Sequence, residues 1–305
     1  MKAAIIGAGF VGMGLAEQLL RAGHEVVLLG PASRLDMAGI PFSQLDVLHE
    51  RITLPDSLDA IFYLAQSTHY REFPKHASHL FGVNTFGAIK AAEAALHVGC
   101  RFFFYASTGS VYAPSFSPLS ERTPVQTTEA YALSKYMAEE ALALFSSKMH
   151  ICVGRIFGVF GPGQKKMLPA LIRDRLSRQE PILLAPHPVN GHDGGLHISF
   201  IYNQDLARIL IKLSEKALRG DNIPLRLNLA GPEALSLETF SLKLGKAMKI
   251  TPMFEYLNSP RSFDLVADST LTNQTLTPAF TTLDEAIESV AEFTSSQVPP
   301  AKPGA

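Results

Sequence analysis

The sequence predicts an α/β fold, a doubly wound parallel sheet with a smaller C-terminal domain. Three observations lead to this class. Short apolar runs alternate with helix-like segments up to about residue 160, as in successive βαβ units whose sheet is covered on both faces. A glycine-rich turn follows the first apolar run. After Gly161 the alternation loosens and Pro and Gly become frequent.

The elements are expected in a regular order. Strand-like runs occupy residues 3–6, 25–29, 60–64, 101–106 and 151–155, with a later one near 225–229. Helix-like segments lie between them at 12–22, 83–97 and 130–146. The pieces after Gly161 are expected to interleave with the last strands, so the boundary between the two domains should be discontinuous.

The turn after the first strand carries the first chemical signal. Gly7, Gly9 and Gly12 form a GxGxxG pattern between a strand and a helix, and a second strand follows. In a dinucleotide site these glycines permit the turn, the approach of a pyrophosphate and close helix packing, respectively. Glycines also make purely structural turns, but the strand, turn, helix, strand context is complete here. We therefore expect a Rossmann-type cofactor site, to which Phe10 and Val11 also contribute.

The end of the second strand bears on the choice of cofactor. An acidic residue there would hold the ribose 2'-hydroxyl of NAD, but the chain has Gly30, followed shortly by Ser33 and Arg34. These two residues could bind the 2'-phosphate of NADP, although Arg34 could also be a solvated loop residue. The sequence therefore allows NADP or NAD and slightly favours NADP.

Further cofactor contacts are expected where later strands end, because ligands collect at the carboxyl edge of open α/β sheets. Asp46 and Val47, in "LDVL", lie near the expected position of the adenine. The stretch "YLAQS" places Leu64, Ala65 and Gln66 at the end of another strand.

The stretch "EAYALSK" offers a candidate acid/base. Tyr131 is the only one of the eight tyrosines with a Lys, Lys135, at the fourth position after it. Residues four apart share a helix face, and an ammonium nearby would stabilise a phenolate, whose ordinary pKa of about 10 is too high for a base at neutral pH. Thr127 or Thr128 is the expected N-cap of this helix. An ordinary pair on a solvated helix is the alternative, and it would be favoured for an isolated Tyr and Lys.

Two other segments favour the catalytic interpretation. The run "FFFYASTGSVYA" ends a strand with hydroxyls at Ser107, Thr108 and Ser110, one of which could hold a substrate oxygen while the Tyr exchanges its proton. Asn84 lies near the start of a helix, where it could contact the cofactor or order water. The simpler roles are capping of a turn by the hydroxyls and of a helix by Asn84.

Composition argues against several other classes of protein. The chain has 27 basic and 28 acidic residues, a net charge of -1, which does not suggest a nucleic-acid binder. No apolar run approaches the roughly 20 residues of a membrane span. Cys100 and Cys152 lie beside apolar runs without metal-ligand spacing, which fits a reduced, cytoplasmic setting.

One loop invites a metal interpretation. The stretch "PHPVNGHDGGLH" contains His187, His192, Asp193 and His197. A Pro- and Gly-rich loop does not hold ligands in the register of a helix or hairpin. We therefore expect no metal, and we expect a mobile loop over the substrate instead.

The motifs, taken in order, resemble those of the extended short-chain dehydrogenases/reductases, the NAD-dependent epimerase/dehydratase family. The glycine turn is followed by "YLAQS", "VNTFGAIKAAEAA", "FFFYASTGSVYA", "YALSK", "GRIFGVFGPGQ" and "FIYNQDLARIL". The segment "LNLAGPEALSLETF" and residues 268–286 are also similar, so the resemblance covers nearly the whole chain. It implies a Rossmann domain that binds NAD(P), a smaller domain that covers the substrate, and often a homodimer formed through two helices per subunit.

The resemblance also implies domain limits and residue roles. The cofactor domain would span 1–160, joined by about 197–230, the substrate domain 161–196 and 231–295, and a disordered tail 296–305. Tyr131 would be the catalytic acid/base, and Lys135 would lower its pKa and hold the nicotinamide ribose. Thr108 would hydrogen-bond the reacting oxygen. The remaining cofactor contacts would come from Asn84, Ser107 and Phe157.

Departures from the family pattern narrow the range of expected reactions. Sugar-nucleotide dehydratases have an Asp and a Glu after the catalytic Thr, where this chain has Gly109 and Ser110. Without these proton-transfer groups a dehydratase of that type is not expected.

Other departures concern the substrate. Gly158 stands where many members have an Asn that touches the substrate. His197 and Ile198 lie near the place of an Arg that pairs with a substrate phosphate. Charge for a nucleotide sugar could come instead from the basic residues Arg155, Lys165 and Lys166.

The sequence thus predicts an NAD(P)-dependent epimerase or oxidoreductase that acts at a secondary alcohol or ketone, with nucleotide sugars as a candidate substrate class. Two alternatives stay open at this point. One is a reductase of a small carbonyl compound. The other is a non-enzymatic NADP-binding sensor, which would need the glycine turn but neither the Tyr nor the Lys.

Overall fold

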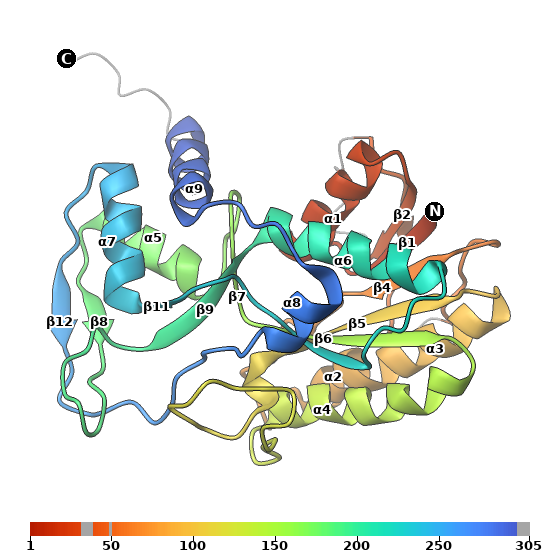
Figure 1. Ribbon diagram of the computed structural model, residues 1–305, viewed down its shortest axis with the longest axis horizontal. Coiled ribbons are helices and arrows are strands. Elements are labelled where there is room, and N and C mark those ends of the chain that lie inside the picture. Colours follow the sequence, from red (N-terminus) through yellow and green to blue (C-terminus); the bar gives the residue numbers. More distant parts are fainter. Residues whose placement is uncertain (32–38, 49–50, 298–305) are drawn as a thin grey trace.

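The computed structural model describes residues 1–31, 39–48 and 51–297 of the chain. Its main element within these residues is a seven-stranded, wholly parallel sheet in the order β10-β6-β5-β4-β1-β2-β3 (Figure 1). The strands are β1 (Lys2–Ile6), β2 (Glu25–Gly30), β3 (Phe42–Gln44), β4 (Ala60–Tyr63), β5 (Phe102–Thr108), β6 (His150–Ile156) and β10 (Arg226–Leu229). The order reverses between β1 and β4, which is the switch point at which such sheets bind ligands.

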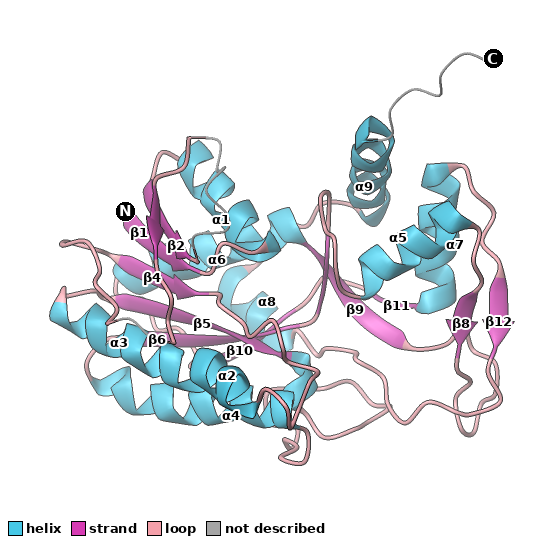
Figure 2. Cartoon of the chain, turned by 180° about the vertical axis from the view of Figure 1, so that it is seen from behind, coloured by secondary structure: helices cyan, strands magenta, loops and turns pink. Residues whose placement is uncertain are grey.

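Helices cover both faces of this sheet, as Figures 1 and 2 show. One face carries α1 (Phe10–Arg21) and α6 (Asn203–Leu218), which pack against each other. The other carries α2 (Ala77–Phe81), α3 (Gly87–His97) and α4 (Ala130–Ala143). The run "FFFY" of β5 serves both layers, because Phe102 and Phe104 join one apolar core while Phe103 and Tyr105 join the other. The predicted fold class is confirmed.

The C-terminal half adds a smaller body beside the sheet (Figure 2). Its apolar core is built around Phe160, Phe200 and Phe240. Its strands are β7 (Gly158–Phe160), β8 (Ile182–Leu184), β9 (His197–Tyr202), β11 (Ala234–Ser236) and β12 (Phe254–Tyr256), and its helices α5 (Leu168–Arg178), α7 (Leu237–Met248) and α9 (Leu283–Gln297). The helix α8 (Thr270–Leu276) packs against β10. The domain limits given above stay a prediction.

Several elements differ from the expectation. The helix expected at 83–97 begins with a π-helical turn, η2 (Gly82–Phe86), before α3. The helix expected at 130–146 ends at Ala143 and continues as the 3-10 turn η4 (Leu144–Ser147). Its predicted cap is wrong, since the N-cap is Glu129 and makes no side-chain cap hydrogen bond.

The C-terminal helix extends further than expected. α9 continues to Gln297, so the first two residues of the expected tail are helical, and 298–305 lie outside the described residues. Among the helices that the structure describes, none is long and apolar enough to cross a membrane.

Candidate active site

The glycine turn between β1 and α1 has room for a ligand at the helix N-terminus. Gly7 has a φ of 120°, and a Cβ there would lie 2.5 Å from the backbone nitrogen of Ala65. A Cβ on Gly12 would collide with the carbonyl oxygen of Gly7. A Cβ on Gly9, in contrast, would meet no protein atom within 4 Å, and Gly9 begins α1 without a side-chain cap. The open side of Gly9 at the helix N-terminus fits a pyrophosphate group.

We expect Gly9→Ala and Gly12→Ala to fail in different ways. Gly9→Ala should fold normally because the added methyl meets no protein atom. It should weaken NADH binding by at least about tenfold, since the methyl blocks the approach of the pyrophosphate. Gly12→Ala should lower the melting temperature, because its methyl collides with Gly7. Thermal unfolding and NADH fluorescence titration measure the two effects, and wild-type affinity in Gly9→Ala would contradict a phosphate site here.

The other expected cofactor contacts follow strands of the same sheet. The first turn of α1 contains Phe10 and Val11, β3 is followed by Asp46 and Val47, and β4 is followed by Leu64, Ala65 and Gln66. All of these strand ends lie at the carboxyl edge of the sheet, because the strands are parallel. Ser33 and Arg34 lie outside the described residues. Contact of any of these residues with a cofactor stays a prediction.

Tyr131 lies in the first turn of α4 with its hydroxyl directed to the end of β4. The hydroxyl donates to Oε1 of Gln66 at 3.0 Å, and the ring of Tyr70 lies 5.2 Å away between ring centres. Burial raises the pKa of Tyr131 above its ordinary value, whereas a hydrogen bond with the Thr108 side chain and the charge of Arg71 lower this pKa. Lowering of this pKa by Lys135 stays a prediction.

Lys135 lies one helical turn after Tyr131 and is buried. Its Nζ donates to the carbonyl oxygen of Ala106 at 2.8 Å and lies 5.0 Å from the centre of the Tyr105 ring. Burial lowers the pKa of Lys135 to about 7, although the nearby carboxylate of Glu139 acts in the opposite direction. The Lys is thus fixed next to the strand that carries Thr108, with its charge sensitive to small changes in its surroundings.

Asn84 organises the site from inside the protein. It is fully buried in η2, where its Oδ1 accepts from the backbone nitrogen of Ser67 at 2.9 Å and its Nδ2 donates to Ser134 Oγ at 2.9 Å. Ser134 lies between Tyr131 and Lys135 on α4. The amide therefore ties the loop after β4 to the Tyr-Lys helix and does not cap its own helix. Its predicted place beside the cofactor stays a prediction.

The hydroxyls of Ser107 and Thr108, at the end of β5, lie in different environments. Thr108 Oγ1 accepts from the backbone nitrogen of Ser110 at 3.2 Å, capping the 3-10 turn η3 (Gly109–Val111). Ser107 is buried and donates its hydroxyl to Glu139. The ring of Phe157 packs on Gly109, where a Cβ would lie 2.7 Å from it. Phe157, which follows β6, thus lies against the turn that follows Thr108.

A buried ion pair beneath these residues was not predicted. Glu139 and Arg155 are 0% and 2% exposed, and Arg155 Nη2 lies 2.6 Å from Oε2 of the carboxylate. Arg226 also donates to Glu139 at 3.3 Å. The proposal that Arg155 supplies charge for a substrate is wrong, because the guanidinium is enclosed and paired. The available signal was Glu139 itself, four residues after Lys135 on the same helix face.

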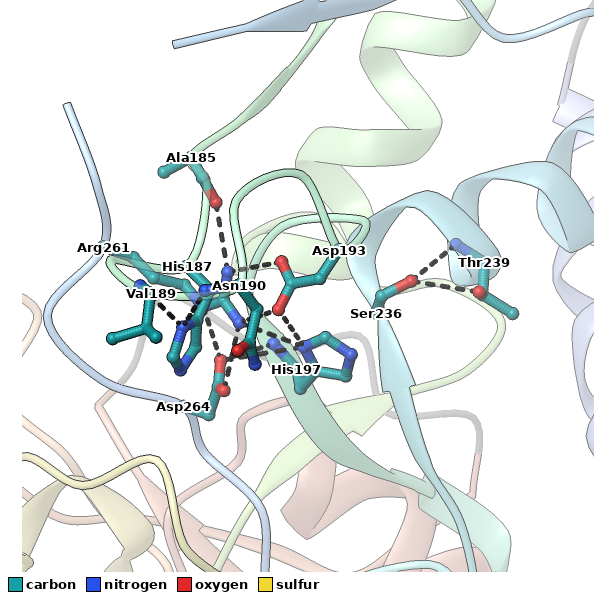
Figure 3. A network of polar contacts seen from close by, with 10 residues as sticks. All are labelled: Ala185, His187, Val189, Asn190, Asp193, His197, Ser236, Thr239, Arg261 and Asp264. Atoms are coloured by element: carbon teal, nitrogen blue, oxygen red, sulfur yellow. Dashed lines mark hydrogen bonds and ion pairs between the residues drawn. The ribbon is translucent and has the colours of Figure 1, made fainter. Parts of the chain in front are cut away.

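The loop considered above as a metal site is organised by an arginine instead (Figure 3). Arg261 donates to both oxygens of Asp193, at 2.7 and 2.6 Å, and to Asp264 at 2.7 Å. His197 Nδ1 lies 3.3 Å from the same guanidinium. His187 accepts from two backbone nitrogens of its own loop. The sequence reasoning missed Arg261, which lies far along the chain from the loop that it holds.

A pocket of about 490 Å³ lies elsewhere in the molecule. Its lining includes Ser199, Gly231 and Asp268 and none of the predicted site residues. The candidate site is therefore defined by the positions of Tyr131, Lys135 and Thr108 near the carboxyl ends of β4 and β5 and not by cavity size.

A family model described as the NAD dependent epimerase/dehydratase family matches residues 3–229. The chain belongs to this family. Membership confirms the resemblance stated from the motifs. It also confirms the class of protein, an NAD(P)-dependent enzyme of the extended short-chain type.

Two curated relatives are similar over much of the chain. A putative UDP-glucose 4-epimerase of Methanocaldococcus jannaschii is 25% identical over 222 residues, covering 66% of this chain and 69% of that protein. A UDP-N-acetyl-alpha-D-glucosaminuronate decarboxylase of Bacillus cytotoxicus is 27% identical over 241 residues, covering 71% and 72%.

Solved structures share the fold over nearly the full length. The UDP-glucose 4-epimerase of Thermotoga maritima, with UDP-glucose, has a TM-score of 0.80 at 19% identity and covers 97% of this chain and 99% of its own. The UDP-glucose 4-epimerase of Stenotrophomonas maltophila, with NAD and formylated UDP-arabinopyranose, has a TM-score of 0.82 at 20% identity and covers 97% and 98%. The slight preference for NADP gains no support from these comparisons.

Proposed function

We propose that this family member is an epimerase that acts at a secondary alcohol of a nucleotide sugar, with Tyr131 as the acid/base. The observation that carries the proposal is the position of the Tyr131 hydroxyl, which meets Gln66 and Thr108 where β4 and β5 end. Two of the similar proteins named above are UDP-glucose 4-epimerases whose structures hold UDP-sugars.

The proposed chemistry assigns one task to each side chain. Tyr131 takes the proton of the substrate hydroxyl and returns it after the carbon has been inverted. Thr108 holds the reacting oxygen in line with the phenol, and Lys135 favours the phenolate when it carries its charge. When bound, NAD(P) supplies the acceptor and donor of hydride. An epimerase receives the hydride back on the other face of the carbon, and a reductase does not.

The turn after Thr108 supports this reaction class over a dehydration. Gly109 and Ser110 offer neither the acid nor the base that loss of water needs. A larger side chain at Gly109 would also collide with Phe157. Inversion or net oxidation at the alcohol needs, besides NAD(P) as hydride acceptor, only the Tyr, Lys and Thr of the site for its proton transfer.

A reductase of a small carbonyl compound is the second candidate, and two observations favour it. A Cβ at Gly158 would lie 2.8 Å from Ile198, so the side chain that many relatives use to touch the substrate has no room here. Arg261 is already neutralised by Asp193 and Asp264. The region around His197, where the family pattern would place a phosphate-binding Arg, is therefore poor in unpaired positive charge.

Product analysis separates the two candidates. The purified protein is incubated with NAD and UDP-glucose, UDP-glucuronic acid or UDP-N-acetylglucosamine, and the sugar protons are followed by NMR. We expect a new epimer from at least one of them. Consumption of NADPH or NADH with small ketones, without any epimer, would replace the first candidate by the second. No turnover in either assay would contradict both.

We further propose a homodimer formed through α3 and α4. Phe86, Met137 and Leu144 are large apolar residues at or next to these helices that are exposed in the single chain, Leu144 by 82%. Burying such a patch would favour association. We expect the wild type to elute as a dimer in light-scattering chromatography and Met137→Glu/Leu144→Glu to elute as a monomer. Leu171→Glu, an exposed position on α5, is the control, and a monomeric wild type would contradict the proposal.

A cytoplasmic location completes the proposal. Cys100 and Cys152 are free and buried, and burial raises the pKa of the Cys100 thiol to about 11. Thiols of this kind are typical of proteins kept in reducing compartments. Fractionation of cells that express the tagged chain tests this location.

A further inference from the structure

The loop between β4 and α2 carries a cluster of metal-ligating side chains outside the site described above. His69, Glu72 and His76 each offer one ligand atom, and these atoms lie within 4.8 Å of one another. We propose that the three residues form a binding site for a divalent transition metal such as Zn²⁺. Sequence reasoning expected no metal and weighed only the loop around His192, which is a different part of the chain.

Two distances in the cluster are close to those between neighbouring ligands of a tetrahedral site. The Glu72 carboxylate has one oxygen 2.9 Å from His69 Nδ1 and the other 3.3 Å from His76 Nε2. Ligand atoms at about 2.0–2.2 Å from a zinc ion lie about 3.4 Å apart in a tetrahedron. Imidazole nitrogen and carboxylate oxygen are both common zinc ligands. Shifts of a few tenths of an ångström at Glu72, with a modest closing of the two rings, would complete three positions.

The two histidine rings lie against each other, and they would have to turn to direct their nitrogens to one ion. His69 and His76 are stacked, with ring centres 4.0 Å apart and planes 23° from parallel. His79 lies edge-on to His69, with ring centres 4.9 Å apart, and its Nδ1 is 2.7 Å from the hydroxyl of Ser67. His79 is not part of the convergent group, so water would supply the fourth ligand.

The surroundings limit the expected affinity. Glu72 is 47% exposed, and Arg71 and Lys75 lie beside it in the chain. Their positive charges oppose binding of a cation. Without a metal, these exposed contacts between the two histidines and Glu72 contribute little to stability. We therefore expect binding no tighter than the micromolar range.

The site would act on the segment that borders the candidate acid/base. Tyr70 lies between the ligands His69 and Glu72 in the chain, and its ring packs on the ring of Tyr131. A metal that joins His69 to His76 would fix this segment and hold Tyr70 in place. Metal binding is thus expected to order the wall of the active site without entering it.

Calorimetry on the full-length protein tests the proposal. After treatment with a chelator and its removal, the protein is titrated with ZnCl₂ and, separately, with CoCl₂ while the visible spectrum is recorded. We expect about one equivalent of Zn²⁺, intense visible bands from tetrahedral Co²⁺, and at least tenfold weaker binding in His69→Gln/His76→Gln and in Glu72→Gln. Circular dichroism verifies the fold of each variant.

Two variants outside the proposed site serve as controls. His150→Gln changes an exposed histidine elsewhere, and His187→Gln changes the loop held by Arg261, so both should keep wild-type affinity. Hydrogen exchange in the peptide that covers 69–76 should slow when Zn²⁺ is added. Failure of the wild type to bind Zn²⁺ at millimolar concentration, or unchanged affinity in Glu72→Gln and the double variant, would overturn the site. Neither outcome touches the proposed function, because no measurement here depends on turnover.

Discussion

Tyr131→Phe is expected to lower kcat by about 10²- to 10⁴-fold or more, which is the contribution of general acid/base catalysis. The variant removes only the hydroxyl that donates to Gln66. The ring remains to pack against Tyr70, so folding should not change. Affinity for NADH, measured by fluorescence titration, should stay within about twofold of the wild type, since the glycine turn that is expected to hold the cofactor is untouched.

Tyr136→Phe is the matched control for this prediction. It removes a phenol hydroxyl from the same helix, at a position five residues further on that is only partly buried. Its kcat should equal that of the wild type. Full activity in Tyr131→Phe with any of the substrates turned over by the wild type would remove Tyr131 from the mechanism.

Glu139→Gln is expected to reduce the free energy of unfolding by about 3–5 kcal/mol, because it leaves the enclosed Arg155 without its counter-charge. Ser107 would also lose the carboxylate to which it donates. The loss should appear in urea denaturation as a lower midpoint with an unchanged slope. The same change removes the group that raises the pKa of Lys135. Lys135 should then lose its charge at lower pH, and activity should fall even where the variant remains folded.

Glu140→Gln tests whether the expected loss of stability comes from the burial of the ion pair or merely from the loss of a negative charge. Glu140 is the next residue in the chain, is exposed and pairs with Arg226 at 2.5 Å. Exposed pairs contribute about 1 kcal/mol or less, so this variant should be nearly as stable as the wild type. The double variant Glu139→Gln/Arg155→Met should recover part of the lost stability, because it leaves no uncompensated charge. Equal effects of Glu139→Gln and Glu140→Gln would contradict the structural role of the buried pair.

Much of the fold could be predicted because the main strands are strongly apolar. The run "FFFY" of β5 is buried on both faces, which is the pattern that a central parallel strand imposes on its sequence. The strand β3 was missed because it has three residues, two of them exposed. The cap of α4 was misplaced because two threonines before it suggested one, whereas the helix begins after Glu129 without a side-chain cap.

The candidate site was predictable where residues are close in sequence or follow adjacent strands. Tyr131 and Lys135 are four apart, and Thr108 ends β5. Partners brought together only by the tertiary fold were missed. Gln66 was expected to contact the cofactor and also accepts from Tyr131. From its sequence context, Arg155 was expected to be available to a substrate. It lies on β6, next to β5, and the fold places it against Glu139 of α4.

The group formed by His69, Glu72 and His76 was missed in the sequence for another reason. Its spacing places the residues three and four apart, as on one face of a helix, yet they lie in turns before α2 begins. Ligand convergence in such a segment depends on the path of the backbone, which propensities do not give. The alternative metal loop has more conspicuous histidines, but His187 Nδ1 accepts from backbone nitrogens of its own loop.

Proton NMR of the reaction in D₂O tests the central claim most directly. The claim is that the carbon-bound hydrogen leaves as hydride and that Tyr131 moves only the hydroxyl proton. The epimerised sugar, or the alcohol that a reductase forms from a ketone and reduced cofactor, should therefore carry no solvent deuterium at the reacting carbon. Incorporation of deuterium there at the rate of turnover would show that the carbon is deprotonated, and it would contradict the account.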